Sequence, residues 1–305
     1  MSTTPSQNDT SPPAGGYRVT TRLVRGEGSP ALEVVETLPD GPRVGAPLLL
    51  VHGAFGGAWM WSEHLAPYLA RRGRSVVALS LRGHGRSEGG ERLRETRLSD
   101  YLADVRRVLA TLPQTPVVVG HSLGGLIAQR LIGRERMAGL VLMASLPPDG
   151  LALVNARTAM TEPLVWLDAV LGSLSNAPGG RGIGPIGAAT LSRGMASSER
   201  LLFSERLPLA RVRRYASMMA PESPRALADA HMPGPVLSAF LTRLPTLVIG
   251  GAEDPLVWRA CTLRTAFYHA ARHETLEACG HFPMLDVAAD EGARRLVDWL
   301  DRHGL

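Results

Sequence analysis

The pentad Gly-His-Ser-Leu-Gly at 120–124 combines residue types and a spacing that suit nucleophilic chemistry. It follows an apolar, strand-like run at 116–119 and precedes a helix-like stretch at 126–133. A Gly-x-Ser-x-Gly pentad between a strand and a helix is typical of a sharp turn that exposes a serine hydroxyl. Ser122 is therefore a candidate nucleophile for acyl transfer. The competing interpretation is an ordinary glycine-rich turn.

A serine nucleophile needs a general base, and nine histidines are available for that role. His281 is favoured, because it lies in a loop after the last strand-like run, where the chain returns to the sheet's carboxyl edge. His84 lies in a tight turn and is expected to brace loops, whereas His52 ends a strand and is expected to be buried and hydrogen-bonded. His121 adjoins Ser122 on the sharp turn, so its side chain should point away from the hydroxyl.

The histidine in turn needs a carboxylate that holds its tautomer. Asp254 is the first choice, since it comes just after the strand-like run at 246–249, while Glu253 beside it should point elsewhere. Asp149 is the second choice. Asp254 also has a purely structural interpretation as the N-cap of a helix that opens at Pro255. The order serine, aspartate, histidine along the chain is the one that accompanies a strand–turn–helix elbow.

A tetrahedral intermediate carries a negative oxygen that backbone N–H groups must stabilise. One donor is expected from Leu123, the residue after the serine, at the start of its helix. The second donor should come from the loop at 52–57, where Ala54 is the first choice and Phe55 the second. These amides would form the oxyanion hole.

Strand-like and helix-like stretches alternate along most of the chain. This alternation predicts an α/β fold with a mostly parallel sheet, helices on both faces and an antiparallel edge formed by the first strands. The expected strands cover 17–24, 31–37, 47–51, 75–80, 117–119, 139–143, 246–249 and 273–276, and the expected helices cover 59–71, 98–112, 126–133, 258–270 and 292–300.

The alternation breaks between 147 and 240, where the apolar periodicity becomes purely helical and the stretch at 178–188 is rich in glycine and proline. An insertion after a strand lies over the carboxyl ends of the sheet, where ligands bind. We therefore expect a helical cap at 147–240 inserted into a core domain of 17–146 and 241–305. The alternative is a helical appendage for oligomerisation. The polar tail at 1–16 is expected to be disordered.

The composition favours a folded globular protein and not a nucleic-acid-binding or membrane protein. The 305 residues are 45% hydrophobic, and the net charge of +5 rests on 33 scattered arginines with no lysine and no nucleic-acid motif. No apolar run approaches the ~20 residues of a membrane span, and the start of the chain lacks a secretion signal, so a cytoplasmic location is expected. Cys261 and Cys279 suit core positions, not a disulfide framework or a metal site. Nothing in the sequence indicates an oligomeric state.

The sequence resembles the α/β-hydrolase-fold serine hydrolases of the esterase and lipase-like branch. Besides the pentad, four motifs in the family's order carry the resemblance: the oxyanion loop at 52–59, a structural turn at 82–87, an acid loop at 250–254 and a histidine loop at 280–283. The resemblance implies an α/β-hydrolase fold and a triad of Ser122, Asp254 and His281, with no metal or cofactor.

The resemblance implies hydrolysis of a carboxylic ester of a small molecule. A serine nucleophile disfavours the epoxide hydrolases and haloalkane dehalogenases of this fold, which place aspartate there. Thioester, lactone or carbon–carbon hydrolysis and a hydroxynitrile-type lyase stay open, as does a non-catalytic ligand-binding or signalling protein. Trp166 and Phe203 in the expected cap indicate an apolar substrate group. Three arginines could bind a carboxylate, although a solvated helix face is the favoured interpretation: Arg206, Arg211 and Arg213.

Overall fold

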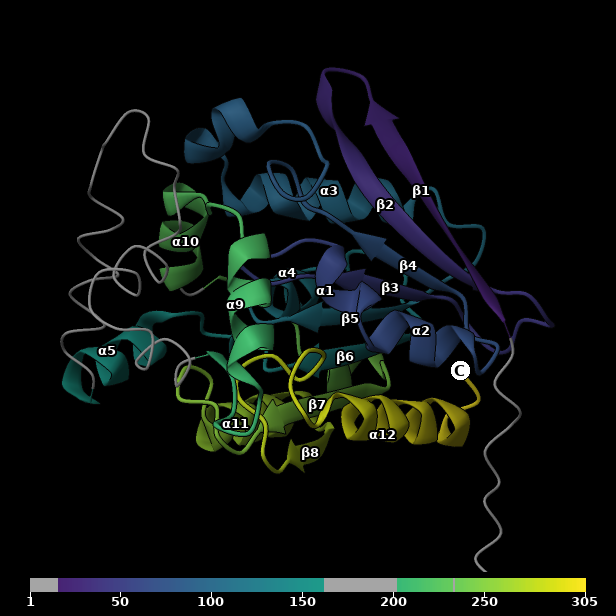
Figure 1. Cartoon of the computed structure of the whole chain (residues 1–305). Coiled ribbons are helices and arrows are strands. Elements are labelled where there is room, and N and C mark those ends of the chain that lie inside the picture. The colour runs from purple at the N-terminus through teal and green to yellow at the C-terminus, as the bar shows by residue number, and fades with distance from the viewer. Residues whose placement is uncertain (1–15, 162–201, 233) are drawn as a thin grey trace, which may run out of the picture.

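An eight-stranded sheet runs through the computed structural model, which describes residues 16–161, 202–232 and 234–305. The strands lie side by side in the order β1-β2-β4-β3-β5-β6-β7-β8 (Figure 1). Their bounds are β1 Tyr17–Gly26, β2 Ser29–Pro39, β3 Leu48–Val51, β4 Val76–Leu79, β5 Val117–His121, β6 Gly139–Met143, β7 Thr246–Gly251 and β8 Arg272–Leu276.

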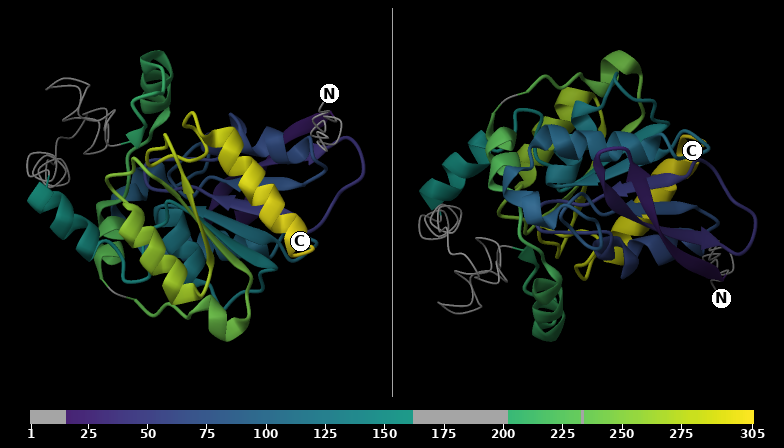
Figure 2. Two further views of the ribbon diagram at one scale, coloured as in Figure 1. Left: turned by 90° about the horizontal axis from the view of Figure 1, so that it is seen from below. Right: turned by 90° about the horizontal axis from the view of Figure 1, so that it is seen from above.

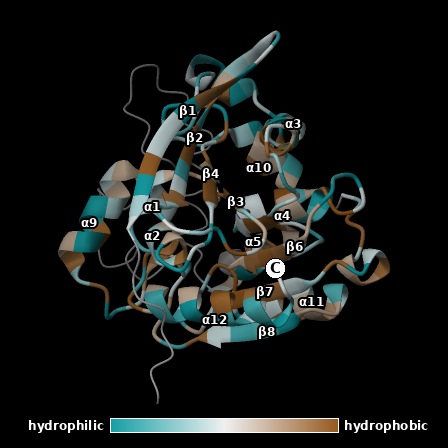
Figure 3. Cartoon of the chain, turned by 90° about the vertical axis from the view of Figure 1, so that its right-hand side faces the viewer, coloured by the Kyte–Doolittle hydropathy of each residue, from teal (hydrophilic) through white to brown (hydrophobic). Residues whose placement is uncertain are grey.

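The strands from β4 to β8 in this order pair in parallel, and every residue of β3, β4, β5, β6 and β7 is buried. Runs without polar alternation suit strands that are covered on both faces. Figure 3 shows the inner strands largely in brown, whereas the edge strand β8 is largely teal. The hairpin of β1 and β2 joins β4 antiparallel, which confirms the predicted antiparallel edge.

Helices cover both faces of the sheet, as the alternation predicts. α1, α2 and α12 pack on one face, where Trp61 and Trp299 are fully buried. α3, α4 and α11 pack on the other. In the view from below, β8 lies between α12 and α11 (Figure 2). The bounds are α1 Trp59–Ser62, α2 Leu65–Ala70, α3 Leu98–Leu109, α4 Leu123–Arg130, α11 Arg259–His269 and α12 Ala289–Arg302.

The single helix predicted over 59–71 is wrong, because the structure divides it into α1 and α2. Pro67 lies in the second piece. A proline lacks the N–H that would bond the carbonyl four residues earlier, and its ring collides with that carbonyl. A continuous helix would require that bond at Glu63, so the chain breaks there. A short 3₁₀ helix at Gly90–Glu95, η1, was not predicted.

Between β6 and β7 the chain forms α5 (Ala152–Thr161), α9 (Leu209–Met218), α10 (Pro224–His231) and the 3₁₀ helix η2 (Ala239–Thr242). Ser223 caps α10: its hydroxyl accepts the amide of Ala226 at 3.1 Å, and Pro224 occupies the first position. The stretch at 178–188, Trp166 and the N-terminal tail lie outside the described residues, apart from Gly16. In the part of the chain that the structure describes, no helix has the length and apolarity to span a membrane.

The arginines of α9 face solvent. Arg211 and Arg213 are exposed, whereas Val212 and Tyr215 on the opposite side are buried against the core. Arg206, just before the helix, is exposed as well. The predicted solvated face is therefore confirmed.

Candidate active site

Ser122 lies at the turn between β5 and α4, so the strand–turn–helix context predicted for the pentad is confirmed. Its backbone has φ +50° and ψ −116°. A positive φ at a non-glycine residue costs about 1–3 kcal/mol and persists only where the surroundings enforce it. The amide of Ser122 donates to the carbonyl of Met143 at 3.1 Å, which ties the turn to β6.

Two glycines of the pentad allow the turn to pack closely. A Cβ on Gly124 would lie 2.3 Å from the carbonyl oxygen of His52 and 2.4 Å from that of Val51. A Cβ on Gly120 would lie 2.6 Å from the carbonyl oxygen of Gly124. Backbone oxygens cannot move aside as a flexible side chain can. Both positions therefore require glycine, and the first turn of α4 rests directly on the end of β3.

The imidazole of His281 connects Ser122 with a carboxylate. Its Nε2 accepts the hydroxyl of Ser122 at 3.0 Å, and its Nδ1–H donates to Oδ2 of Asp254 at 2.9 Å. This tautomer leaves the lone pair on Nε2, where a general base needs it. The three residues are only 8%, 5% and 3% exposed in the order serine, histidine, aspartate. Three residues singled out from the sequence therefore form one hydrogen-bonded row.

Asp254 uses its two carboxylate oxygens for different purposes. Oδ2 faces His281, whereas Oδ1 accepts the amides of Leu256 and Val257, each at 2.9 Å. The alternative interpretation of Asp254 as a helix N-cap is wrong, because no helix opens at Pro255: α11 begins at Arg259 with Trp258 as its N-cap, and the two amides belong to the turn before it. They also fix the carboxylate plane, because one oxygen is held while the other is presented.

The alternative residues lie elsewhere. Asp149 pairs with Arg264 at 2.7 Å on the surface, and Glu253 is exposed. All nine histidines are among the described residues, and of these only His281 hydrogen-bonds Ser122. The geometry therefore favours the first choices for base and acid.

His52 is buried and hydrogen-bonded, as the sequence predicts. Its Nδ1–H donates to the carbonyl of Gly53 at 2.7 Å, and its Nε2 accepts the amide of Leu81 at 2.9 Å. Burial, together with the neighbouring His84, lowers the pKa of His52 to about 3. The ring is therefore neutral at ordinary pH and braces the loop that follows β3.

His121 lies between the histidine loop and the loop that follows β3. Its Nε2–H donates to the backbone carbonyl of His281 at 2.8 Å, away from the hydroxyl of Ser122. A Cβ on Gly53 would lie 2.7 Å from Nδ1 of His121 and 2.8 Å from Cβ of Ser122. Burial and the neighbouring His281 hold the pKa of His121 well below its usual range. A neutral His121 therefore supports the histidine loop on one side and meets the oxyanion loop on the other.

The two candidate oxyanion-hole donors flank the nucleophile. Leu123 begins α4, and Ala54 lies in the loop after β3. Among the described residues, neither amide donates to a protein acceptor. The amide of Phe55, the second choice, already donates to Oε2 of Glu222 at 3.3 Å, and Phe55 has φ +65°. The geometry therefore favours Ala54 over Phe55.

Sequence reasoning missed Asp286, a buried carboxylate beside the histidine loop. It accepts the amide of Gly280 at 2.8 Å and both the amide and the hydroxyl of Ser204, at 2.7 and 2.6 Å. The amide of His281 donates to the carbonyl of Leu202 at 3.0 Å. An aspartate at the end of an apolar stretch was the available signal, because a buried charge must find partners.

Aromatic rings form a row from the histidine loop to α1. The ring centroids of Phe282 and Phe203 are 5.2 Å apart, those of Phe203 and Tyr215 are 5.7 Å apart, and those of Tyr215 and Trp59 are 6.3 Å apart. The members come from the core and from the insertion. Phe203, Tyr215 and Phe282 are buried, so the row packs the insertion against the core.

Cys261 and Cys279 are both free and buried, in agreement with their predicted core positions. Burial raises the pKa of the Cys261 thiol to about 11, so it stays protonated. Across the described ranges, no group of three or more His, Cys, Asp or Glu side chains is placed to hold a metal ion.

The fold agrees with comparisons to known proteins. The model of the alpha/beta hydrolase family matches residues 48–295. That match spans most of the chain, and the chain belongs to this family.

Several curated relatives are similar over part of their length. A monoacylglycerol lipase of Mycolicibacterium smegmatis is 34% identical over 43% of this chain and 46% of its own. Protein phosphatase methylesterase 1 of Mus musculus is 35% identical over 49% of this chain and 39% of its own. Salicylic acid-binding protein 2 of Nicotiana tabacum is 31% identical over 41% of this chain and 51% of its own. The chain thus spans about half, or less, of the length of these relatives.

Solved structures share the fold over nearly the whole chain. An esterase from Exiguobacterium antarcticum superposes with a TM-score of 0.70 at 17% identity, covering 92% of this chain and all 100% of that one. A thermophilic esterase from Thermogutta terrifontis superposes with a TM-score of 0.66 at 20% identity, covering 94% of this chain and 100% of that one. At such identities the likeness establishes the α/β-hydrolase fold.

Proposed function

We propose that this chain is a serine hydrolase that cleaves carboxylic esters of small molecules. The observation that carries the proposal is the hydrogen-bonded row of Ser122, His281 and Asp254 at the strained turn after β5. The names of a lipase and a methylesterase among the relatives support an ester as the substrate class.

In the first half-reaction, the hydroxyl of Ser122 gives its proton to Nε2 of His281 as Oγ bonds to the ester carbonyl carbon. Asp254 stabilises the imidazolium through Nδ1–H. The carbonyl π electrons move to oxygen, and the amides of Ala54 and Leu123 stabilise the oxyanion. When the carbonyl re-forms, the alkoxide leaves and takes the proton from Nε2 as an alcohol.

In the second half-reaction, water attacks the acyl-enzyme. His281 accepts a proton from that water as its oxygen bonds to the acyl carbon. A second oxyanion collapses, and Oγ of Ser122 leaves and recovers the proton from Nε2. The products are a carboxylic acid and the free hydroxyl, so the site returns to its starting state.

The insertion at 147–240 is proposed as a cap over this site, with the core at 17–146 and 241–305. Its described part already contacts the site: the carbonyl of Leu202 accepts the amide of His281, and Phe203 stacks on Phe282. The apolar residues in the sequence of the insertion support an apolar acyl or alcohol group in the substrate.

The experiment that tests this proposal is the turnover of p-nitrophenyl butyrate by the purified chain and by Ser122→Ala. We expect the substitution to lower kcat by about 10⁴–10⁶-fold, because attack and acyl transfer both need the hydroxyl. A variant that keeps more than about a tenth of the activity would contradict the mechanism. A thioester and a lactone assayed in parallel decide whether another acyl group is preferred.

A further inference from the structure

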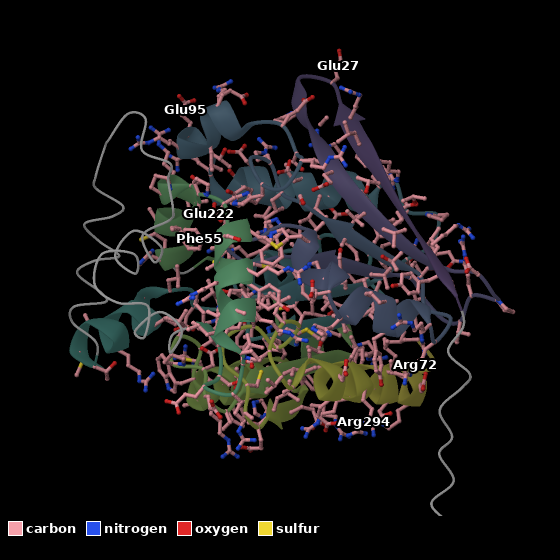
Figure 4. All side chains as sticks on the ribbon, viewed as in Figure 1. Glu27, Phe55, Arg72, Glu95, Glu222 and Arg294 are labelled. Atoms are coloured by element: carbon pink, nitrogen blue, oxygen red, sulfur yellow. The ribbon has the colours of Figure 1, made fainter. Side chains whose placement is uncertain are left out.

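Glu222 is a buried carboxylate that the proposed reaction does not use. It lies between α9 and α10, and its side chain is 1% exposed. Its oxygens accept the hydroxyl of Tyr101 and the amide of Phe55, and Oε2 lies 3.3 Å from Nε2 of His84. Figure 4 shows Glu222 beside Phe55 at the end of α9. A residue of the insertion thus reaches the oxyanion loop of the core.

The insertion holds Phe55 by both of its backbone polar groups. The amide donates to Glu222 at 3.3 Å, and the carbonyl accepts the amide of Ala220 at 3.0 Å. Phe55 has φ +65°, a conformation that a phenylalanine does not keep without external support. The two hydrogen bonds supply that support. They fix the orientation of the two peptide groups on either side of Phe55, and the first of these joins Phe55 to Ala54, the proposed oxyanion donor.

A bare carboxylate near an oxyanion site would oppose the developing negative charge. His84 compensates for it, because a protonated imidazole beside Glu222 makes a pair of zero net charge. Burial is the largest single influence on His84 and would lower its pKa, yet the carboxylate of Glu222, the carbonyl of Arg82 and the charge of Asp104 together leave that pKa raised. Burial alone would raise the pKa of Glu222, yet His84 and the hydrogen bonds it accepts leave it lowered. Both shifts favour the charged forms, whose charges balance each other within the pair.

From this arrangement we infer that Glu222, balanced by His84, is a positioning residue for the oxyanion loop. It holds Phe55 at positive φ and occupies its amide, so that the amide of Ala54 stays free for the substrate oxygen. The inference rests on the proposed ester hydrolysis and adds a specific requirement to it. The oxyanion hole depends on a side chain that comes from the inserted segment.

A matched control lies on the same insertion. Asp229 of α10 accepts the amide of Leu98 at 3.2 Å and pairs with Arg97 at 3.3 Å, so it also joins the insertion to the core. No contact connects Asp229 with the oxyanion loop among the described residues. Asp229 is 30% exposed against 1% for Glu222, so it controls for the loss of a contact between insertion and core and not for the loss of a buried charge.

The experiment compares Glu222→Ala, Glu222→Gln and Asp229→Asn with the unaltered chain. Each is checked by circular dichroism and by its melting temperature, and kcat and KM are measured on p-nitrophenyl butyrate below that temperature. We expect Glu222→Ala to lower kcat by about 10–100-fold with KM nearly unchanged, because an oxyanion donor acts in the transition state and its full removal costs about 10²–10³. In Glu222→Gln the amide oxygen still accepts the N–H of Phe55, so about a third to a tenth of kcat should survive.

Asp229→Asn should leave kcat and KM within about twofold of the unaltered chain. The rate of Ser122 phosphonylation by a fluorophosphonate should follow kcat across the series, since its P=O occupies the same oxyanion site. If Glu222→Ala fails to fold, Glu222→Gln alone tests the inference: a lower kcat at constant KM supports it, and an unchanged kcat overturns it.

A folded Glu222→Ala with unchanged kcat, or one in which only KM rises, would overturn the inference while the proposed function stands. An equal loss in Asp229→Asn would overturn it too. If the unaltered chain neither turns over esters nor reacts with the fluorophosphonate, the proposed function fails and the inference falls with it.

Discussion

The proposed catalytic row and the proposed oxyanion loop are held in different ways. Ser122, His281 and Asp254 each follow a strand of the core sheet, and short loops bring them together at its carboxyl edge. The oxyanion loop also follows a core strand, but Glu222 and Ala220 of the insertion fix its conformation at Phe55. In the proposed reaction, proton transfer therefore depends on the sheet. The proposed stabilisation of the oxyanion depends on how the insertion docks.

The histidine loop lies between these two cases. His281 follows β8 of the core, yet Asp286 binds Gly280 to Ser204, which belongs to the insertion. Two buried carboxylates thus join the insertion to the site, one at each loop. Substitutions in the row of Ser122, His281 and Asp254 should therefore nearly abolish ester turnover. Substitutions of Glu222 or Asp286, which join the insertion to the site, should only lower it.

The largest effect in this comparison is expected for Asp254→Asn. An asparagine at this position would favour the wrong tautomer of His281, so kcat on p-nitrophenyl butyrate should fall by about 10³–10⁴-fold with little change in KM. Glu253→Gln, one residue away and exposed, is the control and should keep its activity. Comparable activity in both variants would show that Asp254 does not orient His281 for catalysis.

A smaller loss is expected for Asp286→Asn. The amide replaces an acceptor oxygen with a donor that faces other donors, so the histidine loop should shift and kcat should fall by about 10–100-fold. Unfolding in urea should show a loss of about 2–4 kcal/mol, because buried N–H groups lose their acceptor. Glu205→Gln, at an exposed neighbour of Ser204, is the control. A destabilised variant with full kcat would make Asp286 a purely structural residue.

The pair of Glu222 and His84 should show itself in the pH dependence of stability. The folded-state pKa of Glu222 is lowered, so its contribution is present above about pH 4.5 and is lost as the pH falls through that folded-state value. The folded-state pKa of His84 is raised, so its contribution is present below about pH 6.5 and is lost as the pH rises through the raised value. The pair therefore stabilises most between these limits.

We expect the difference in free energy of unfolding between the unaltered chain and Glu222→Gln to be greatest at about pH 4.5–6.5 and to shrink on either side, by at most about 1.4 kcal/mol per pH unit and proton. Urea unfolding across this range measures it. A difference that does not vary with pH would contradict the charged pair. Other titratable or charged groups also face the pair and are the same in both proteins, so they cancel in this difference: Tyr101, Asp104, Arg82 and His52.

The smallest effect is expected for Asp149→Asn. Asp149 is a sequence-level alternative for the acid, but the structure pairs it with Arg264 on the surface. Exposed ion pairs contribute about 0–1 kcal/mol, so stability should change by no more than that and kcat by no more than about twofold. A large loss of kcat would indicate that the acid has been assigned to the wrong strand end.

Local sequence patterns predict the row well because each member follows a strand that is itself recognisable. The pentad at 120–124 indicates both a strand–helix turn and the positions that need glycine. The apolar runs before Asp254 and His281 indicate where strands end. Parallel strands bring such ends to one edge of a sheet. The eight strands and their mostly parallel order follow from the same patterns.

The supports of the site were not predictable in this way. Glu222 lies 167 residues from Phe55 along the chain, and Asp286 lies 82 residues from Ser204. No periodicity or spacing connects such partners, since their contact exists only after the insertion has packed on the core. Only the burial of a lone acidic residue in an apolar context hints at them. The break between α1 and α2, which Pro67 explains, shows the opposite case, in which a local signal was present and overlooked.

The most direct test of the account is to treat the full chain with a fluorophosphonate and to map the adduct by mass spectrometry, with His281→Ala and Ser122→Ala alongside. We predict one adduct, on Ser122, formed far more slowly in His281→Ala and not at all on any residue of Ser122→Ala. An adduct on another residue, or equal rates with and without His281, would contradict the assignment of Ser122 as a nucleophile activated by that histidine.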